Sequence, residues 1–226
     1  MKVINTVIVG LAVFVLSGCA ANQVPKGELF PKMYSDMPKT VLVLPAINHS
    51  TAADAPYLYS STIAQPLANA GFYVLSTEIT RKFFENEGLT TGEQLSAVPP
   101  AKFRQIFGAD AVLYVTIEKW DTNYFIIGGN VTVGISYLLK STRTGAELWS
   151  YANQMVVDTG GDSNNNGGLL GALIATAIKT STQDYVPIAA QVNFMALNNI
   201  PYGDYHNLHG KDQSMMTSDH RNQPKP

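Results

Sequence analysis

The sequence predicts a single α/β domain at residues 40–200, with a mixed β-sheet of about five strands and helices packed on it. The run 40–44 is almost wholly apolar and is stopped by Pro45, which is typical of a strand buried on both faces. Between Val131 and Leu139, apolar residues take every second position, which is typical of a strand with one buried face. Segments with helical spacing lie between such strands, and this alternation is the α/β pattern.

A helix and a second strand are expected after the first strand. Four apolar residues recur at helical spacing before Gly71: Tyr59, Ile63, Leu67 and Ala70. Pro66 lies inside this stretch and should kink the helix or divide it. Residues 72–75 then form a second strand, so that the chain makes a right-handed βαβ unit.

Two shorter helices are expected before the third strand. Residues 77–86 form the first helix, with Phe83 and Phe84 facing inward and Gly88 ending it. A turn-rich piece follows. Residues 99–108 form the second helix, because proline stands in its first turn and Gly108 at its end.

Three strands complete the predicted sheet. Residues 111–120 are strongly β-forming, with Leu113, Val115 and Ile117 on one face. The pair Gly128–Gly129 suits a tight hairpin turn into the alternating strand. Residues 142–145 turn the chain again, into a last strand at about residues 147–157.

The stretch 158–168 is rich in glycine and asparagine, so a flexible loop is expected there. An apolar stripe with helical spacing follows: Leu169, Leu170, Leu173, Ile174, Ala177 and Ile178. We interpret the stripe either as a helix packed across the sheet or as a partner-contact or membrane-touching helix, with Leu169, Leu170, Leu173 and Ile174 as the contact residues. Lys179 interrupts the run too early for a membrane span. A further helix is expected from Pro187 to Leu197.

The amino-terminal residues have the organisation of a cleaved export signal. Lys2 supplies a positive charge, residues 3–16 form an apolar run, and small residues precede Cys19, the only cysteine. The run is shorter than the roughly 20 residues that a membrane-spanning helix needs. An ordinary signal peptide with an incidental cysteine is the other alternative.

Residues Leu16, Ser17, Gly18 and Cys19 resemble the lipobox of bacterial lipoproteins. The resemblance implies removal of a signal peptide at residues 1–18, by cleavage between Gly18 and Cys19, and attachment of diacylglycerol and an N-acyl chain to Cys19. Two or more acyl chains anchor a protein stably. Ala20, where Asp would favour the inner membrane, implies sorting to the outer membrane, on its periplasmic face.

The segments on either side of the domain lack periodic patterns. Residues 19–39 contain Pro25, Pro31 and Pro38 and are expected to form the lipidated cysteine and an extended tether. Residues 201–226 have little to bury and are expected to be a disordered tail.

Composition restricts the classes of function. The formal net charge is −2, and this excludes the strongly basic footprint of a nucleic-acid-binding protein. Charged residues make up 14% of the chain, against about 25% in typical soluble domains. Such a weakly charged surface is consistent with a protein that packs against partners. A lone cysteine allows no disulfide within the chain.

Two groups of polar residues contain the ingredients of a site. Four tail residues have side chains that could ligate a metal: Asp204, His206, His209 and Asp212. No periodic structure would preorganise them, so we expect neither a metal nor another cofactor. Residues His49, Ser50 and Asp54 contain the chemistry of a nucleophilic triad, but neighbouring loop residues seldom adopt its geometry and no Gly-x-Ser-x-Gly elbow is present. We interpret them as a polar loop cap.

Three segments together carry a family resemblance. Residues 41–45, with Asn48, Ser50 and Thr51, resemble the "VxVLPF-x-N-x-(S/T)" opening of CsgG and TolB-amino-terminal domains. Residues 108–115 resemble their "GAD" segment before the central strand, and residues 144–150 their "TG-x-x-hydrophobic-W" hairpin. Among such proteins, the chain looks most like a family of bacterial lipoproteins first described from neisserial genomes.

The resemblance implies a CsgG/TolB-amino-terminal-like α/β domain used in assembly. We therefore expect a non-enzymatic outer-membrane lipoprotein that serves as an accessory subunit of a cell-envelope complex. Its expected partners are other envelope proteins, among them a CsgG-type lipoprotein, or copies of itself. The alternatives are an envelope hydrolase or cell-wall glycan binder that uses the loop 49–54, and an oligomeric pore. The pore is disfavoured because two long amphipathic hairpins are not evident in the sequence.

Overall fold

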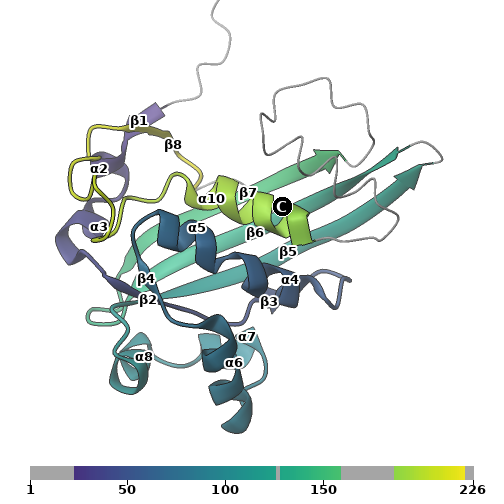
Figure 1. Ribbon diagram of the computed structural model, residues 1–226, viewed down its shortest axis with the longest axis horizontal. Coiled ribbons are helices and arrows are strands. Elements are labelled where there is room, and N and C mark those ends of the chain that lie inside the picture. The colour runs from purple at the N-terminus through teal and green to yellow at the C-terminus, as the bar shows by residue number, and fades with distance from the viewer. Residues whose placement is uncertain (1–22, 126–127, 159–185, 222–226) are drawn as a thin grey trace, which may run out of the picture.

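A computed structural model of the protein describes residues 23–125, 128–158 and 186–221. Figure 1 shows one twisted β-sheet with helices on its faces and a small second sheet at one end. The predictions for Gly18 and Cys19, and for the stripe of Leu169, Leu170, Leu173 and Ile174, lie outside the described residues. None of the helices in the described ranges combines the length and hydropathy of a bilayer-spanning helix.

The main sheet has six strands: β2 (Thr40–Val43), β3 (Ile47–Asn48), β4 (Tyr73–Val74), β5 (Ala111–Phe125), β6 (Gly128–Ser141) and β7 (Glu147–Asp158). Their order is β4-β2-β5-β6-β7, with β3 also paired to β5. The strands β4, β2, β3 and β5 pair in parallel, whereas β5, β6 and β7 are antiparallel. The mixed α/β prediction is therefore confirmed, but the expected number of about five strands is too low. The strand β3 is only two residues long and has no periodic pattern, and a separate two-stranded sheet lies outside the predicted domain.

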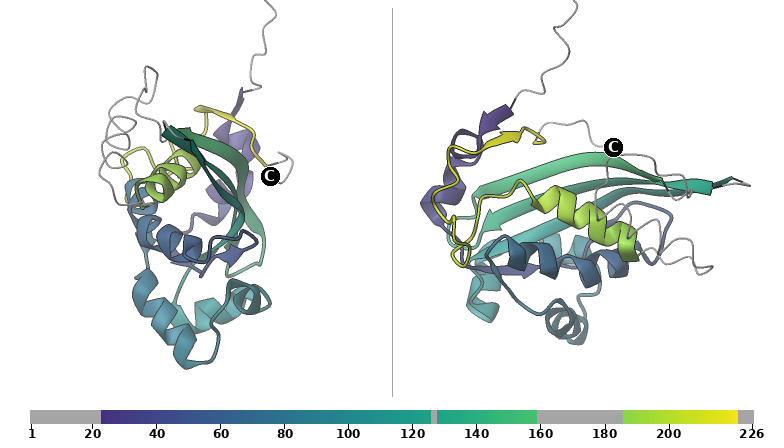
Figure 2. Two further views of the ribbon diagram at one scale, coloured as in Figure 1. Left: turned by 90° about the vertical axis from the view of Figure 1, so that its right-hand side faces the viewer. Right: turned by 45° about the horizontal axis from the view of Figure 1, so that its top comes forward.

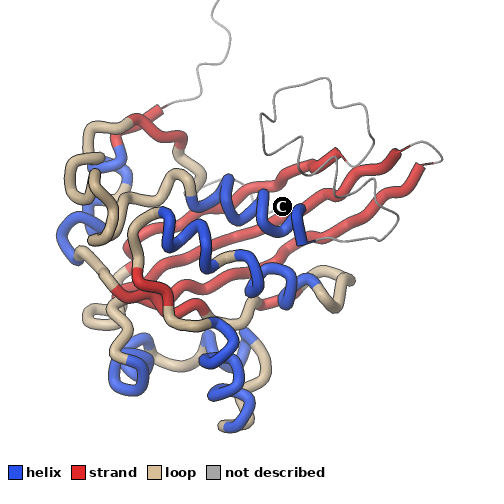
Figure 3. Tube along the Cα trace, in the orientation of Figure 1, coloured by secondary structure: helices blue, strands red, loops and turns tan. Residues whose placement is uncertain are grey.

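The strand β2 is buried on both faces, as the continuous apolar run predicts. Val41 and Val43 belong to the large core, and Leu42 and Leu44 to a smaller core on the other side of the sheet. Three helices cover the large core: α4 (Ala55–Thr62), α5 (Ala64–Asn69) and α10 (Val186–Leu197). The smaller core lies under α6 (Thr77–Asn86), α7 (Gly92–Ser96) and α8 (Pro100–Phe107). Figure 3 shows this layering, with the long strands extending past the helices at one end.

Local sequence signals set several helix ends. The helical stretch divides at Ile63 into α4 and α5, because Pro66 has no N–H to donate to the carbonyl of Thr62. The helix α8 ends at Gly108, whose φ of +68° lies in the left-handed region that glycine adopts without strain. The short helix α7 was missed, although Thr91 and Gln94 form a capping box at its start.

Two local predictions are wrong. Phe84 is buried, but Phe83 is 37% exposed, because consecutive helical residues point about 100° apart and only one of them can face the core. Gly128 and Gly129 do not form the hairpin turn. They already lie in β6, opposite Phe125 and Tyr124.

The largest corrections concern the two ends of the described chain. The expected tether contains β1 (Gln23–Pro25), α2 (Lys26–Leu29) and α3 (Pro31–Asp36), with Leu29 and Met33 buried. The expected disordered tail is folded over residues 201–221 and contains β8 (Met216–Ser218), which pairs with β1. Each segment alone has too few apolar residues to bury. Because they pack on each other and on the domain, the folded unit extends well beyond the predicted residues 40–200.

Candidate functional site

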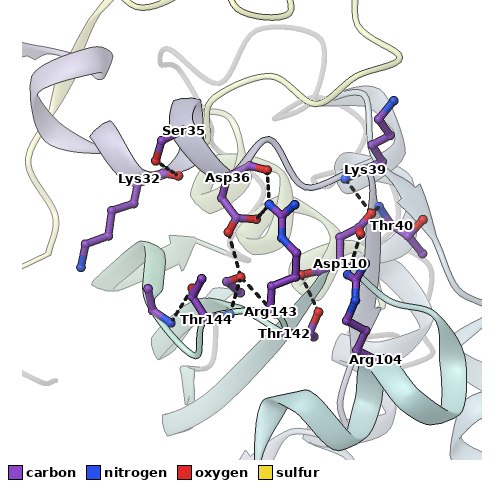
Figure 4. A network of polar contacts seen from close by, with 12 residues as sticks. Lys32, Ser35, Asp36, Lys39, Thr40, Arg104, Asp110, Thr142, Arg143 and Thr144 are labelled. Atoms are coloured by element: carbon purple, nitrogen blue, oxygen red, sulfur yellow. Dashed lines mark hydrogen bonds and ion pairs between the residues drawn. The ribbon is translucent and has the colours of Figure 1, made fainter.

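Asp110 of the second motif and the residues that flank the first and third motifs meet at one junction, which Figure 4 shows. The carboxylate of Asp110 accepts hydrogen bonds from the backbone amides of Lys39 (3.2 Å) and Thr40 (3.1 Å) and from the guanidinium of Arg104 (3.0 Å). Burial opposes ionisation, but these donors together hold the pKa of Asp110 below its ordinary value. The aspartate therefore joins the start of β2 to the start of β5.

The turn between β6 and β7 is tied to the same junction. The hydroxyl of Thr142 donates to the carbonyl of Ala109 at 2.6 Å. The hydroxyl of Ser141 donates to Asp36 at 2.8 Å, and the guanidinium of Arg143 lies 2.9 Å from the same carboxylate. These polar groups bind backbone and one another, so the motif residues at this junction position the scaffold.

The tryptophan of the third motif is also structural. Trp149 is 1% exposed, and its ring stacks on Tyr151 with centroids 6.2 Å apart. Its indole N–H donates to the side chain of Asn199 at 3.3 Å. The motif that carries the family resemblance thus fixes β7 to the segment after α10.

A buried ion pair joins the first and last segments of the described chain. The ammonium of Lys26 lies 3.7 Å from Asp212 and donates to the carbonyl of Ile200 at 3.0 Å. The amide of Tyr202 donates to the same carboxylate at 3.0 Å, and the Tyr202 ring lies 4.6 Å from the ammonium. The side chains of Lys26 and Asp212 are 4% and 0% exposed, so this cluster is a buried contact between the first and last segments. Burial lowers the pKa of Lys26, and the charge of Asp212 partly offsets that effect.

The candidate metal ligands of the tail do not converge. The ring of His206 stacks on Tyr202, with centroids 3.7 Å apart, and His209 Nδ1 lies 2.9 Å from the Tyr202 carbonyl oxygen. Asp204 lies 3.6 Å from His209 Nε2, whereas Asp212 is occupied in the buried ion pair. Within the described ranges, no group of three His, Cys, Asp or Glu side chains is arranged to hold a metal.

The loop after β3 does not place its residues as a triad. His49 Nδ1 lies 2.9 Å from Glu118, and the hydroxyl of Ser50 donates to Asn48 at 2.7 Å. Asp54 stands at the start of α4, where its side chain makes no capping hydrogen bond. The serine therefore faces an amide oxygen that does not act as a base, and the histidine is held by a carboxylate outside the predicted set.

A cavity of about 620 Å³ opens beside this loop, at the carboxyl end of β2. Its walls come from the end of β2, from α4 and from the segment α6–α7. Ligands of open α/β sheets bind at the carboxyl ends of parallel strands, at the point where the connections from two neighbouring strands go to opposite faces of the sheet. Here β2 leads into α4 over the large core, whereas its neighbour β4 leads into α6 over the smaller core on the other face, so the cavity lies at such a point. Pro45, which ends the strand in the sequence, marks the place.

The cavity has an apolar wall and a polar rim. The wall includes Val43, Leu44, Pro45 and Leu89, and the rim includes Asn48, Tyr57, Arg81, Glu85 and Glu93. Tyr57 is 64% exposed. Arg81 forms ion pairs with Glu85 and with Glu78. Asn48 belongs to the first sequence motif. The other rim residues have no signal in the sequence, because they come from three separate elements, α4, α6 and α7, that only the fold brings together.

Comparison with known proteins gives the family. Residues 30–204 match the family described as "Putative lipoprotein GNA1162-like". The curated relative "Putative lipoprotein NMB1124/NMB1162", from Neisseria meningitidis serogroup B (strain ATCC BAA-335 / MC58), is 34% identical over 198 residues, which cover 86% of this chain and 90% of the relative.

Two solved structures are similar to this chain. The crystal structure of lipoprotein GNA1162 from Neisseria meningitidis is 35% identical, with a TM-score of 0.50, and the match covers 63% of this chain and 96% of that one. A PelC dodecamer from Paraburkholderia phytofirmans is 17% identical, with a TM-score of 0.44 over 73% of this chain and 89% of that chain. The family match covers residues 30–204, and the neisserial relative is 34% identical over most of both chains. This chain therefore belongs to the GNA1162-like lipoprotein family.

Proposed function

We propose that the protein is a lipid-anchored lipoprotein of the outer membrane that faces the periplasm and serves as a non-enzymatic accessory subunit of an envelope complex. Membership of a lipoprotein family supports the anchor, and a lone Cys19 after Leu16, Ser17 and Gly18 is the residue to carry it. Diacylglycerol and an N-acyl chain on Cys19 would together give stable attachment.

An accessory rather than catalytic role is supported by how the described polar residues are used. The side chains of Asp110, Thr142 and Trp149 bind scaffold groups, and the hydroxyl of Ser50 donates to the side chain of Asn48. The expected partners are other envelope proteins, among them a CsgG-type lipoprotein, or further copies of this chain. The likeness of the domain to CsgG and TolB-amino-terminal domains stays a prediction.

The anchor is tested by Cys19→Ser. The variant is expected to keep the fold and to move from the outer-membrane fraction to the soluble periplasmic fraction, since lipid attachment requires the thiol. Fractionation by density gradient measures this. A Cys19→Ser protein that still sediments with the outer membrane would refute the anchor.

The accessory role is tested by cross-linking intact envelopes and purifying the wild-type protein. One or a few envelope proteins should be recovered in constant ratio, and the Cys19→Ser variant serves as the control for contacts that depend on membrane location. Recovery of the protein alone, from envelopes in which a known complex is captured, would contradict the role.

The cavity at the end of β2 favours a second candidate function, the binding of a cell-wall glycan. Its volume lies in the range of small-ligand sites, which is about 300–1,000 Å³. An exposed aromatic ring such as Tyr57 offers a face for the C–H groups of a sugar, and Asn48, Glu85 and Glu93 offer hydrogen-bonding partners for hydroxyls. A hydrolase that uses the loop 49–54 has less support, because His49 pairs with Glu118.

Glycan binding is tested with soluble peptidoglycan fragments and the variant Tyr57→Ala. Tyr57 is exposed, so the variant should keep its melting temperature and lose most of its affinity for the fragments in calorimetry. Exposed Tyr73, which does not line the cavity, provides the matched control Tyr73→Ala. If the wild-type protein shows no binding at millimolar fragment, this candidate is excluded.

A further inference from the structure

The two-stranded sheet of β1 and β8 has two different faces. Val24 and Thr217 are direct partners in the pairing and lie on the inner face, where Val24 packs against the large core and Thr217 is 7% exposed. Side chains of a strand alternate between faces, so the pairs on either side point outward. They are Gln23 with Ser218 and Pro25 with Met216.

The outer face carries no charged side chain among these four residues, and it is apolar at one end. Met216 is 53% exposed, and the neighbouring Met215 is 40% exposed. Methionine is flexible and polarisable, so it adapts to irregular apolar surroundings. We refer to Gln23, Pro25, Ser218 and Met216 as the outer face of the β1–β8 ribbon.

This ribbon is tied to the domain by the hydrogen bond from the Lys26 ammonium to the carbonyl of Ile200, at 3.0 Å, and its two segments are tied to each other. The amides of Lys26 and Gly27 donate to the carbonyls of Met215 and Gln213, each at 2.9 Å. The Lys26–Asp212 ion pair lies directly after β1 and before β8. The ribbon therefore has a fixed orientation relative to the sheet, so a surface that contacts the ribbon also sets the orientation of the domain.

The ribbon also begins very close to the proposed anchor. Gln23 follows Cys19 by four residues, which span at most about 14 Å when fully extended. Gln23, at the start of the outer face, therefore lies within about 14 Å of an acylated cysteine. A folded ribbon at this place replaces the long tether expected from the sequence.

We infer that the outer face of the β1–β8 ribbon lies against the lipid surface, with Met216 in contact with the headgroup–acyl boundary. The inference rests on the proposed lipid anchor at Cys19, because the short connection is what brings the face to the membrane. The occupant is a lipid surface, since the chain that leads from this face ends at the acyl chains themselves. Contact at this face orients the domain.

The orientation has a consequence for the rest of the molecule. Figure 2 shows the ribbon at the top of the protein and the helices α6, α7 and α8, in blue to teal, at the bottom. The cavity at the end of β2, whose walls include α6–α7, then faces away from the membrane. Its rim is left accessible to groups in the aqueous space.

The experiment uses the full chain in its lipidated form, reconstituted in phosphatidylethanolamine–phosphatidylglycerol vesicles. The lipid occupies the thiol of Cys19, so Met216→Cys supplies a single reactive thiol for an environment-sensitive fluorophore. Ile79→Cys is the matched control, because Ile79 is an exposed apolar residue (71% exposed) of α6 at the opposite end. Ser218→Cys provides a second label on the outer face. Thermal unfolding checks that all three variants remain folded.

Lipids with a nitroxide near the headgroup should quench the labels at residues 216 and 218 several-fold more than the label at residue 79. Equal or weaker quenching at both ribbon positions, in protein that floats with the vesicles, overturns the inference and leaves the anchor standing. Protein that does not float and whose intact mass shows an unmodified Cys19 overturns the anchor and the inference together. The two failures are therefore distinguishable.

Discussion

The two ends of the molecule both contain a basic side chain paired with carboxylates, but in opposite surroundings. At the ribbon end, Lys26 and Asp212 are almost wholly buried. At the cavity end, Arg81 is paired with Glu78 and Glu85, and all three side chains are at least a third exposed. A buried pair whose partner is removed leaves an uncompensated charge, whereas an exposed pair is solvated with or without its partner. The buried pair at the ribbon end is therefore needed for stability, whereas the charged groups at the cavity end are accessible to a ligand.

The largest effect is expected from breaking the buried pair. Lys26→Met should lower the free energy of unfolding by about 3–5 kcal/mol, because Asp212 is then buried without a counter-ion. Urea denaturation measures the loss. The double variant Lys26→Met/Asp212→Asn should recover a large part of it, since an amide can still accept from the Tyr202 N–H. If the double variant is as unstable as the single one, the pair is not the cause.

Asp110 lies between these extremes and gives a pH-dependent test. Its pKa is lowered in the folded state, so its contribution to stability is complete above the unfolded pKa of about 3.9 and is lost as pH falls through the folded pKa. Asp110→Asn should cost about 1–3 kcal/mol at pH 7, through weaker bonds to Thr40 and Arg104. Urea unfolding at pH 7 and pH 3 should show that the difference from the wild type shrinks in acid. An equal difference at both pH values would contradict this account.

A smaller effect is expected where the carboxyl-terminal segment covers the edge of β7. The carbonyl of His220 accepts from the Ala152 amide at 3.0 Å, and its ring lies 4.8 Å from Tyr151. Burial lowers the pKa of His220, against the opposing charge of Asp219. The stability that depends on neutral His220 is thus present above the unfolded pKa of about 6.5 and falls as pH drops toward the folded pKa.

The variant His220→Phe isolates this contribution, because it keeps an aromatic ring on Tyr151 and cannot be protonated. At pH 5, hydrogen exchange of the Ala152 amide should be slower in the variant than in the wild type. At pH 7.5, the two proteins should exchange this amide at the same rate. The same ratio at both pH values would show that His220 does not titrate in this range.

The smallest effect on stability is expected at the cavity. Arg81→Ala should leave the free energy of unfolding almost unchanged, because exposed ion pairs contribute little to stability. Any affinity for peptidoglycan fragments should fall, since Arg81 stands on the cavity rim. Lys82→Ala, one residue away on α6 and not on the rim, is the matched control. A loss of stability at Arg81 comparable to that of Lys26→Met would remove the contrast between the two ends.

Much of the fold could be predicted from local patterns. The apolar run at β2, the alternation in β6 and the glycine at the end of α8 each depend on neighbours within a few residues. Local patterns did not show which of two adjacent aromatic side chains faces the core, and Phe83 is the exposed one. They also did not show that β6 begins at Gly128, before its alternating pattern starts.

The candidate sites were harder to predict, because their residues are distant in the sequence. The cavity rim combines Tyr57, Arg81 and Glu93 from three elements, none of which has an unusual pattern by itself. The histidine pair of the tail and the loop at Ser50 looked chemical in sequence, but their partners are a tyrosine ring and an asparagine. Residue type indicates what a side chain can do, and the fold decides what it meets.

The sequence by itself determined the α/β class and the burial of β2 on both faces, because periodicity is a local signal. The export signal at residues 1–19 stays a prediction of the same local kind. Only the tertiary structure decided that residues 23–36 and 201–221 are folded. Lys26 bonds to Ile200, 174 residues away, and neither segment can bury enough apolar surface without the other. Long-range pairing of this kind leaves no periodic trace in either segment, and it places the folded ribbon four residues from Cys19.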